Sequence, residues 1–197
     1  ELLDRAAEAM GGAKAIAAIQ RLRVRSSKTT KTSAGERIDV LSLVLAFPDG
    51  VREDASWGEW RSSSVLAPGD AFEVGNDGTA ADMHPTARRE LLRSARRHPL
   101  ALLKLRGRAG FQARATGAGR MGDRDVERVE TFFEGARTTL GVDPVSGEVV
   151  CVAYRGRGLE LFFVDVVRTY SGWKRAGDAV LPHRSSLTFD GKPRPDG

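Results

Sequence analysis

Apolar and polar positions alternate with a period of two along most of the chain, which is the pattern of half-buried β-strands. In the first such segment, Leu22 and Val24 alternate with Arg21, Arg23 and Arg25. Further strand-sized segments lie at 38–47, 51–57, 59–66, 71–74, 111–116, 126–133, 138–142, 149–154, 159–170 and 180–189. Short turn sequences, such as Pro-Asp-Gly at 48–50, separate several neighbours. Because connections this short join only antiparallel strands, the pattern predicts a mostly β, antiparallel protein.

A period near 3.6 residues replaces this alternation in two parts of the chain. Near the start, apolar residues recur at helical spacing over 2–10, the pair Gly11-Gly12 interrupts them, and a second short helix follows over 15–19. In the middle, Pro85 and Pro99 are each followed by helix-like apolar spacing, and proline suits the first turn of a helix. The spacing therefore predicts helices over 85–97 and 99–105, inserted between two β-rich halves.

Length and composition fit one folded domain over residues 1–197. Hydrophobic residues make up 41% and charged residues 29% of the chain, which is typical of a globular protein. We expect the last residues, 192–197, to fray. Because the sequence begins at Glu1 and not at a methionine, we also expect that a signal peptide or an upstream domain has been removed.

The positive charge is concentrated in the predicted helical segment. Residues 84–108 contain eight Lys and Arg residues and only one acidic residue, Glu90, so this segment carries a charge of +7. The rest of the chain carries −2, which gives the net charge of +5. The cluster could be a solvated helix face, or it could contact an anionic membrane surface or a partner protein. Nucleic-acid binding is disfavoured, because aromatic residues are not interleaved with the arginines. The candidate contact residues are Arg88, Arg89, Arg93, Arg96 and Arg97.

Sequence motifs for catalysis are weak. Residues 117–122 spell Gly-x-Gly-x-x-Gly, but a strand and not a helix is predicted to follow, so we interpret them as a loop. The three histidines, His84, His98 and His183, have no metal-ligand spacing, so no metal and no cofactor are expected. Cys151 lies in an apolar run typical of a buried structural thiol. We therefore predict that the protein is not an enzyme, and keep a Cys151/His183 nucleophilic pair as the minority alternative.

Aromatic residues occur at both parities of the predicted strands. The adjacent pair Phe132-Phe133 must place one ring on each face of a sheet. A sheet with one wet face would not place large rings on both sides. Either both faces are covered, or one face lines an apolar cavity.

Several short motifs resemble bacterial outer-membrane lipoprotein-sorting proteins of the LolA/LolB type. The opening resembles theirs in the sequence AAEAMGG at 6–12 followed by IAAI at 16–19. The sequence LGVDPVSG at 140–147 is similar to their hairpin with a central Asp-Pro, and YSG at 170–172, VLPHR at 180–184 and DGK at 190–192 are similar to their closing pattern.

This resemblance implies an unclosed antiparallel β-barrel, or strongly curved half-barrel, of about eleven strands with residues 85–106 as a helical lid. It also implies a cavity between sheet and helices that holds an acyl chain of a lipid or lipoprotein without covalent chemistry. We expect a monomer in the periplasm or elsewhere in the bacterial envelope. The candidate cavity residues are Val44, Trp57, Trp60, Phe72, Leu91, Leu102, Phe132, Phe162 and Tyr170.

A second hypothesis keeps the same fold but fills its core. The chain would then be an accessory or assembly domain of the envelope that docks a partner through the basic helical segment. The two hypotheses differ in whether an apolar binding surface is left open.

Overall fold

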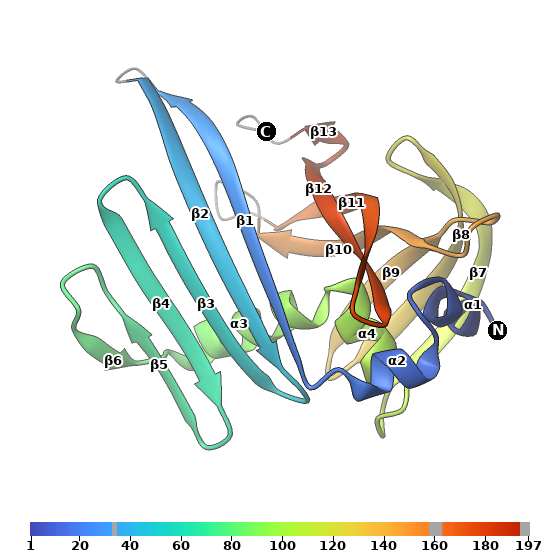
Figure 1. The fold of residues 1–197 in the computed structure, drawn as a ribbon, viewed down its shortest axis with the longest axis horizontal. Helices are drawn as coiled ribbons and strands as arrows, with labels where there is room; N and C mark the ends of the chain where they lie inside the picture. The colour runs from blue at the N-terminus through green and yellow to red at the C-terminus, as the bar shows by residue number, and fades with distance from the viewer. Residues whose placement is uncertain (33–34, 158–162, 194–197) are drawn as a thin grey trace. The chain divides into compact units, whose positions relative to one another are not determined.

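The computed structural model describes residues 1–32, 35–157 and 163–193 (Figure 1). The described chain divides into two compact units, each with its own antiparallel sheet. Unit 2 is formed by residues 19–96, whereas unit 1 combines residues 1–18 with the chain from residue 97 onward. The mostly β, antiparallel architecture with helices and unclosed sheets confirms the predicted fold class.

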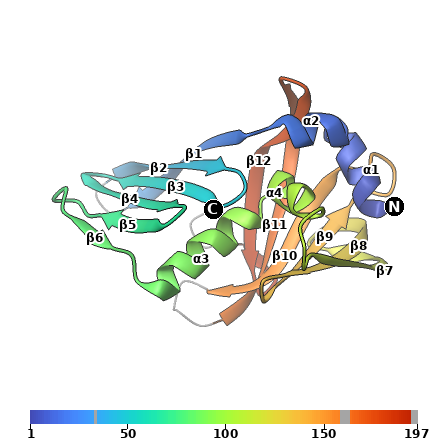
Figure 2. The ribbon, with the colours of Figure 1, turned by 90° about the horizontal axis from the view of Figure 1, so that it is seen from below.

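Unit 2 is a six-stranded meander in which every strand pairs with the next one along the chain. A helix, α3, follows the last strand, contacts β3 and lies against one face of the sheet (Figures 1 and 2). The elements are β1 (Arg21–Thr32), β2 (Gly35–Ala46), β3 (Gly50–Trp57), β4 (Trp60–Ala67), β5 (Asp70–Val74), β6 (Ala80–Asp82) and α3 (Pro85–Arg96).

Unit 1 contains a seven-stranded antiparallel sheet with strand order β13-β12-β11-β10-β9-β8-β7. Three helices contact one another beside it. The elements are α1 (Leu2–Ala9), α2 (Ala13–Ala18), α4 (Pro99–Leu105), β7 (Gln112–Met121), β8 (Arg124–Phe133), β9 (Ala136–Val142), β10 (Val149–Arg157), β11 (Phe163–Ala176), β12 (Ala179–Phe189) and β13 (Lys192–Pro193).

The core of unit 1 lies on one face of this sheet, which we call the core face. Val129 of β8 is paired with Leu140 of β9, Leu140 with Val152 of β10, and all three side chains are buried. Helix α4 contributes Leu100 and Leu103, which are also fully buried. Because paired residues point to the same side, the core face presents a continuous apolar row for the helix to cover.

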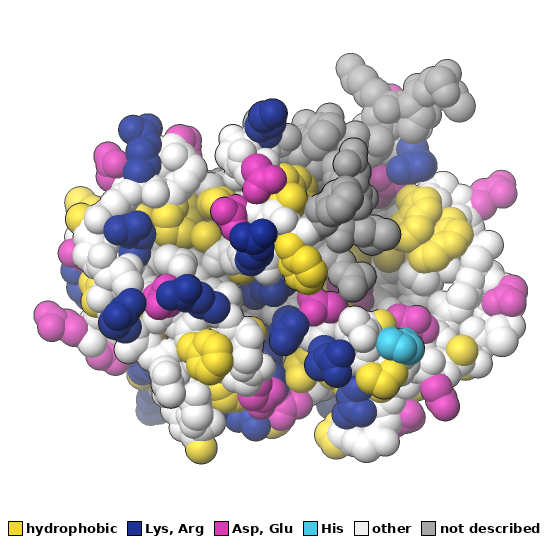
Figure 3. Space-filling view, turned by 180° about the vertical axis from the view of Figure 1, so that it is seen from behind, with side chains coloured by type: hydrophobic (Ala, Val, Ile, Leu, Met, Phe, Trp, Pro, Cys, Tyr) yellow, Lys and Arg dark blue, Asp and Glu magenta, His cyan; other side chains and the backbone are white. Residues whose placement is uncertain are grey.

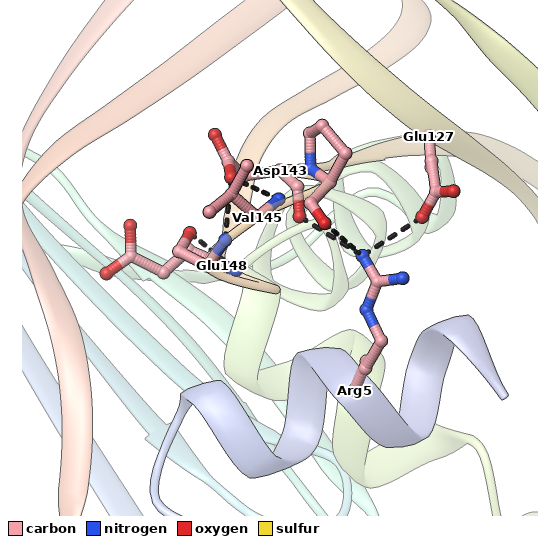
Figure 4. Close-up of polar contacts among 7 residues, drawn as sticks. Arg5, Glu127, Asp143, Val145 and Glu148 are labelled. Atoms are coloured by element: carbon pink, nitrogen blue, oxygen red, sulfur yellow. Dashed lines mark hydrogen bonds and ion pairs between the residues drawn. The ribbon is translucent and has the colours of Figure 1, made fainter.

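A polar network joins α1 to the β9–β10 turn (Figure 4). The Arg5 guanidinium donates to the carbonyl oxygens of Asp143 and Pro144 at 3.3 and 3.2 Å, and forms an ion pair with Glu127 at 3.0 Å. Within the turn, the Asp143 Oδ1 atom accepts hydrogen bonds from the amides of Val145 and Ser146 at 2.9 and 2.8 Å. The predicted Asp-Pro hairpin is therefore also the docking point of the first helix.

Two local expectations differ from the structure. The segment Gly117–Met121, interpreted as a loop, is the second half of β7, where a register shift between Ala115 and Gly117 lets the strand continue. Gly117 has φ +82°, so the backbone bends there without the clash that a side chain would meet. Lys192 and Pro193, expected to fray, pair with Phe189 and Thr188, and residues 194–197 lie outside the described chain.

Within the described residues, no helix combines the length and the hydropathy that crossing a bilayer would require.

Candidate functional site

One face of the unit 2 sheet carries its buried apolar residues, and we call it the leucine face. Leu45 is paired with Leu22 and with Val51, and Val51 with Leu66, so the four side chains form a row across β1–β4. All four are buried. The row is the packed end of this face.

The leucine face continues along the strands into a more open region. Leu43 and Leu41 follow Leu45 on alternate positions of β2, and Trp57 follows Val51 on β3. Burial decreases along this direction, since Leu41 is 38% and Trp57 39% exposed. The open end of the leucine face is therefore apolar but incompletely covered.

Trp57 and Trp60 lie together at the end of the β3–β4 hairpin. They are directly paired across the two strands, and their rings stack with centroids 3.5 Å apart and an interplanar angle of 15°. Gly58 has φ +60° in the turn that joins them. The two candidate cavity residues thus form one stacked aromatic pair on the leucine face.

Val44 and Phe72, two other candidates, lie on the opposite face of the same sheet. Val44 is paired with Arg52, Arg52 with Val65, and Val65 with Phe72, which places all four on that side. Val44 and Phe72 are half-buried. Within unit 2 the candidates therefore divide between two faces, because even-numbered positions on β2 point away from the odd-numbered leucines.

The remaining candidate cavity residues have different surroundings. Leu102 of α4 and Tyr170 of β11 are buried in unit 1, and Leu91 of α3 is half-buried. Phe132 is 45% exposed, whereas its neighbour Phe133 is 7% exposed. These exposures confirm the prediction that the two rings lie on opposite faces of the sheet. Phe132 also lines a cavity of about 590 Å³ between β7, β8 and β9. Phe162 lies outside the described residues.

The basic segment is partly neutralised by local contacts. Arg96 contacts Asp49 at 2.7 Å, Arg93 contacts Glu90 at 2.9 Å, and the Arg97 guanidinium lies 3.9 Å from the centre of the Tyr154 ring. Arg88 and Arg89 are exposed on α3. Figure 3 shows Lys and Arg side chains interspersed with Asp and Glu side chains over one face of the molecule. Arg88 and Arg89 are the members of the set best placed for an external contact.

Glu53 is a residue that the sequence analysis missed. It lies on the leucine face between its pairing partners Leu43 and Ser64, and it is half-buried. Burial raises the pKa of its carboxyl group above the ordinary value. The only feature of the sequence that could have indicated this burial is spacing, since Glu53 lies two residues after the buried Val51 and therefore on the same face of β3. This position brings an acidic group to an apolar surface.

The groups considered for catalysis are placed unfavourably for it. Burial raises the pKa of the Cys151 thiol to about 11, so the thiol stays protonated at neutral pH and is a poor nucleophile. Its Sγ donates to the carbonyl oxygen of Met121 at 3.5 Å, and His183 is exposed on β12. Within the described part of the chain, no three His, Cys, Asp or Glu side chains are grouped so that they could hold a metal ion.

Comparison with known proteins identifies the fold. Neither the protein-family models nor the curated protein sequences match the chain. A solved domain from Vibrio parahaemolyticus, named as a candidate outer membrane lipoprotein-sorting protein, is similar over 95% of this chain and 84% of its own, with TM-score 0.52 and 12% identity. A chain of the MucA/MucB complex of Pseudomonas aeruginosa aligns at 14% identity over 99% of this chain and 58% of its own, with TM-score 0.28. The chain therefore has the fold of the lipoprotein-sorting domain, which confirms at the level of fold the resemblance to LolA/LolB-type proteins.

Proposed function

We propose that the protein is a non-catalytic carrier that binds an acyl chain of a lipid or lipoprotein. The observation that carries this proposal is the open end of the leucine face, where Leu41, Leu43 and the stacked Trp57 and Trp60 are incompletely covered. A surface of this kind gains free energy when an apolar ligand removes it from water. The fold shared with a lipoprotein-sorting domain supports the same type of ligand.

The size of the expected gain favours a long hydrocarbon chain. Each CH2 group removed from water stabilises the complex by about 0.8 kcal/mol. Burial of a long acyl chain could therefore offset the conformational and translational entropy that the chain loses on binding. The stacked indole rings of Trp57 and Trp60 would provide apolar surface for van der Waals contact with such a chain. Release needs no chemical step, because every contact would be non-covalent.

The other candidate residues belong to the same proposal. Val44, Phe72, Leu91, Leu102, Phe132, Phe162 and Tyr170 stay predicted ligand contacts. A carrier of this type would act as a monomer in the periplasm or bound to another part of the envelope. Residues 85–106 would form its lid.

A binding experiment with a dansyl-labelled fatty acid tests the proposal. We expect saturable binding with a blue-shifted dansyl emission and energy transfer from tryptophan. The variant Leu41→Glu places a charge on the open end of the leucine face at an already exposed position, and should weaken binding about tenfold or more. Val145→Glu, at an exposed position of the β9–β10 turn, introduces the same charge elsewhere, is the matched control and should bind as the parent does.

Two results would count against a carrier. One is absence of saturable binding by the folded protein. The other is equal affinity of the parent and the Leu41→Glu variant. Mass spectrometry of solvent extracts from protein purified from a bacterial host adds an independent measurement, in which a carrier should yield lipid in a reproducible molar ratio.

The exposed pair Arg88 and Arg89 favours a second candidate function, docking to an anionic surface or envelope protein. Co-sedimentation with phosphatidylglycerol vesicles tests the membrane form of this hypothesis. The double variant Arg88→Glu/Arg89→Glu should lose binding, and Arg120→Glu/Arg175→Glu, at exposed positions of β7 and β11, serves as the charge-matched control. Equal sedimentation of all three proteins would reject vesicle binding through α3.

A further inference from the structure

The outer face of β7–β9, opposite the core face, carries a small group of side chains with a common direction. Gln112 is paired with Phe132, Arg114 with Glu130, and Phe132 with Arg137. Paired and alternate residues point to the same side, so all five lie on the outer face. Together with Ala113 and Thr131 they line the cavity of about 590 Å³. We call this group the β7 cradle.

The β7 cradle has more cationic than anionic groups. The Arg137 guanidinium lies 2.7 Å from Glu130 Oε1, and the Arg114 guanidinium lies 3.5 Å from Glu130 Oε2. Both arginines are exposed, and together they offer many more N–H donors than one carboxylate can accept. Arg137 donates to Glu130 and holds its pKa below the ordinary value, so the carboxylate stays ionised. The cradle therefore keeps a net charge of +1 and open donors for a second anion.

An aromatic ring lies beside these charges. Phe132 is next to Glu130 on the outer face and is flanked on the neighbouring strands by Gln112 and Arg137. Its ring is exposed, in contrast to the buried ring of its neighbour Phe133. A chain that fits the cradle needs an anionic side chain and an apolar side chain two residues apart, because the charged and aromatic positions of the cradle have that spacing.

The strand that carries half of the cradle is also the edge of its sheet. Within the described residues β7 pairs with β8 alone, and Figure 2 shows it at the border of unit 1. Residues Gln112–Ala115 are exposed and in regular register before the shift at Gly117. Every second residue of an edge strand directs its N–H and C=O away from the sheet, where another strand can pair with them.

We propose that the β7 cradle binds an extended acidic peptide segment of a partner protein. The segment pairs with the backbone of Gln112–Ala115 as an added strand, and places an acidic side chain beside Arg114 and an apolar side chain beside Gln112, on the same face as Phe132. The edge requires an extended chain, and the excess of guanidinium groups selects an acidic one. Alternation of acidic and apolar residues matches the period-two spacing of the cradle.

A fluorescein-labelled pentapeptide of alternating valine and glutamate is the probe. We expect its fluorescence anisotropy to rise with protein concentration, and the binding to weaken as salt is added. Replacing glutamate by glutamine in the peptide should weaken binding, and so should N-methylation of alternate peptide bonds, which removes backbone donors. In the amide NMR spectrum of the protein, the largest shifts should fall on Gln112–Ala115.

Variants separate the cradle from general attraction to a basic protein. Arg114→Ala should weaken binding about tenfold, the size expected for loss of a charge-assisted hydrogen bond. Arg137→Ala should weaken binding less, because Arg137 engages the Glu130 carboxylate that competes with the peptide for Arg114. Glu130→Gln should strengthen binding, because it removes the carboxylate that competes with the peptide. Arg120→Ala, on the same strand but outside the cradle, is the matched control and should leave the affinity unchanged.

Several outcomes would overturn the proposal. These are equal binding by Arg114→Ala and the parent, weaker binding by Glu130→Gln, or amide shifts confined to other strands. Equal affinity for the N-methylated peptide would show that the arginines bind a carboxylate without strand addition. Binding of the dansyl fatty acid does not depend on these variants, so the cradle and the carrier function fail or succeed separately.

Discussion

His98 caps α4 through its ring, because the Nδ1 atom accepts a hydrogen bond from the backbone amide of Leu100 at 3.2 Å. The same arrangement begins α3, where His84 Nδ1 accepts from the amide of Thr86 at 3.2 Å. In both places a proline follows the histidine and needs no partner for its missing N–H. An acceptor nitrogen must be unprotonated, so the cap formed by the half-buried His98 depends on a neutral ring.

The stability of the protein should therefore depend on His98 below neutral pH. Burial, aided by the charge of Arg168, lowers the pKa of His98 from 6.5 to about 4 in the folded protein. The unfolded chain binds this proton first, so the free energy of unfolding should fall as the pH drops from about 6.5 to about 4. The loss is on the order of 3 kcal/mol when complete. Urea denaturation at a series of pH values measures it.

The control for this prediction is His98→Asn, which keeps a capping oxygen without a titrating ring. We expect this variant to lose less stability than the parent between pH 6.5 and pH 4.5. An identical pH dependence of the two proteins would show that His98 is not the responsible group.

Glu53 should have the opposite pH dependence. Burial raises the pKa of its carboxyl in the folded state, so the folded protein retains a proton that the unfolded chain has lost. The contribution of this group to stability is present below the unfolded pKa and is lost as the pH rises through the folded pKa. Glu53→Gln should thus stabilise the protein at pH 7 and have less effect at pH 4. Glu73→Gln, at an exposed position of β5, is the control.

Gly141 is required by close packing and not by its backbone angles. A Cβ atom there would lie 3.0 Å from Met121 Sδ, 3.1 Å from Val126 Cγ2 and 3.2 Å from the Cys151 Cβ. Gly141→Ala should lower the free energy of unfolding by about 1–3 kcal/mol, as overpacking of a filled core does. Gly107→Ala, where a new Cβ has no neighbour within 4 Å, should leave it nearly unchanged. Thermal and urea denaturation compare the two.

The β9–β10 turn can be tested through its aspartate. Asp143→Ala removes the oxygen that accepts from the amides of Val145 and Ser146, and should destabilise the protein by about 1–2 kcal/mol. Asp143→Asn keeps an acceptor at the same place and should recover most of this loss. If both variants lose the same stability, the charge and not the hydrogen-bond geometry holds the turn.

The sequence predicted local structure well because the responsible interactions are local. Pro85 and Pro99 marked the starts of α3 and α4 correctly, since proline suits the first helical turn. The alternation along β1 and the Asp-Pro turn likewise indicated strands and a hairpin. These features depend on neighbours a few residues apart.

The division of the strands into two sheets could not be read in the same way. Within each sheet every strand pairs with the next one along the chain, and the two sheets separate at the helical segment between β6 and β7. The sequence of this segment does not show whether the strands on its two sides pair with each other. The candidate cavity residues show the same limit. Val44 and Trp57 are both apolar strand residues, yet pairing register places them on opposite faces of one sheet. Because the candidate cavity residues were chosen by residue type, they include residues from both faces of the sheet.

The burial of Glu53 and the β7 cradle are further features that composition conceals. An isolated Glu in a strand is usually solvated, and only its register beside Leu43 shows that it lies on an apolar face. The cradle combines charges from three strands, Arg114, Glu130 and Arg137, that are unremarkable one by one.

The composition of unit 1 from two separated segments constrains the order in which the protein can fold. The amide of Val180 donates to the carbonyl oxygen of Met10 at 3.0 Å, and Gly11 packs against Asp178, so α1 joins the far end of the chain. During synthesis, β1–β6 can pair through short hairpins as soon as they emerge, whereas α1 has to wait for β12. Folding from the ribosome should therefore begin in unit 2, and α1 should reach its final place only after β12 has been made.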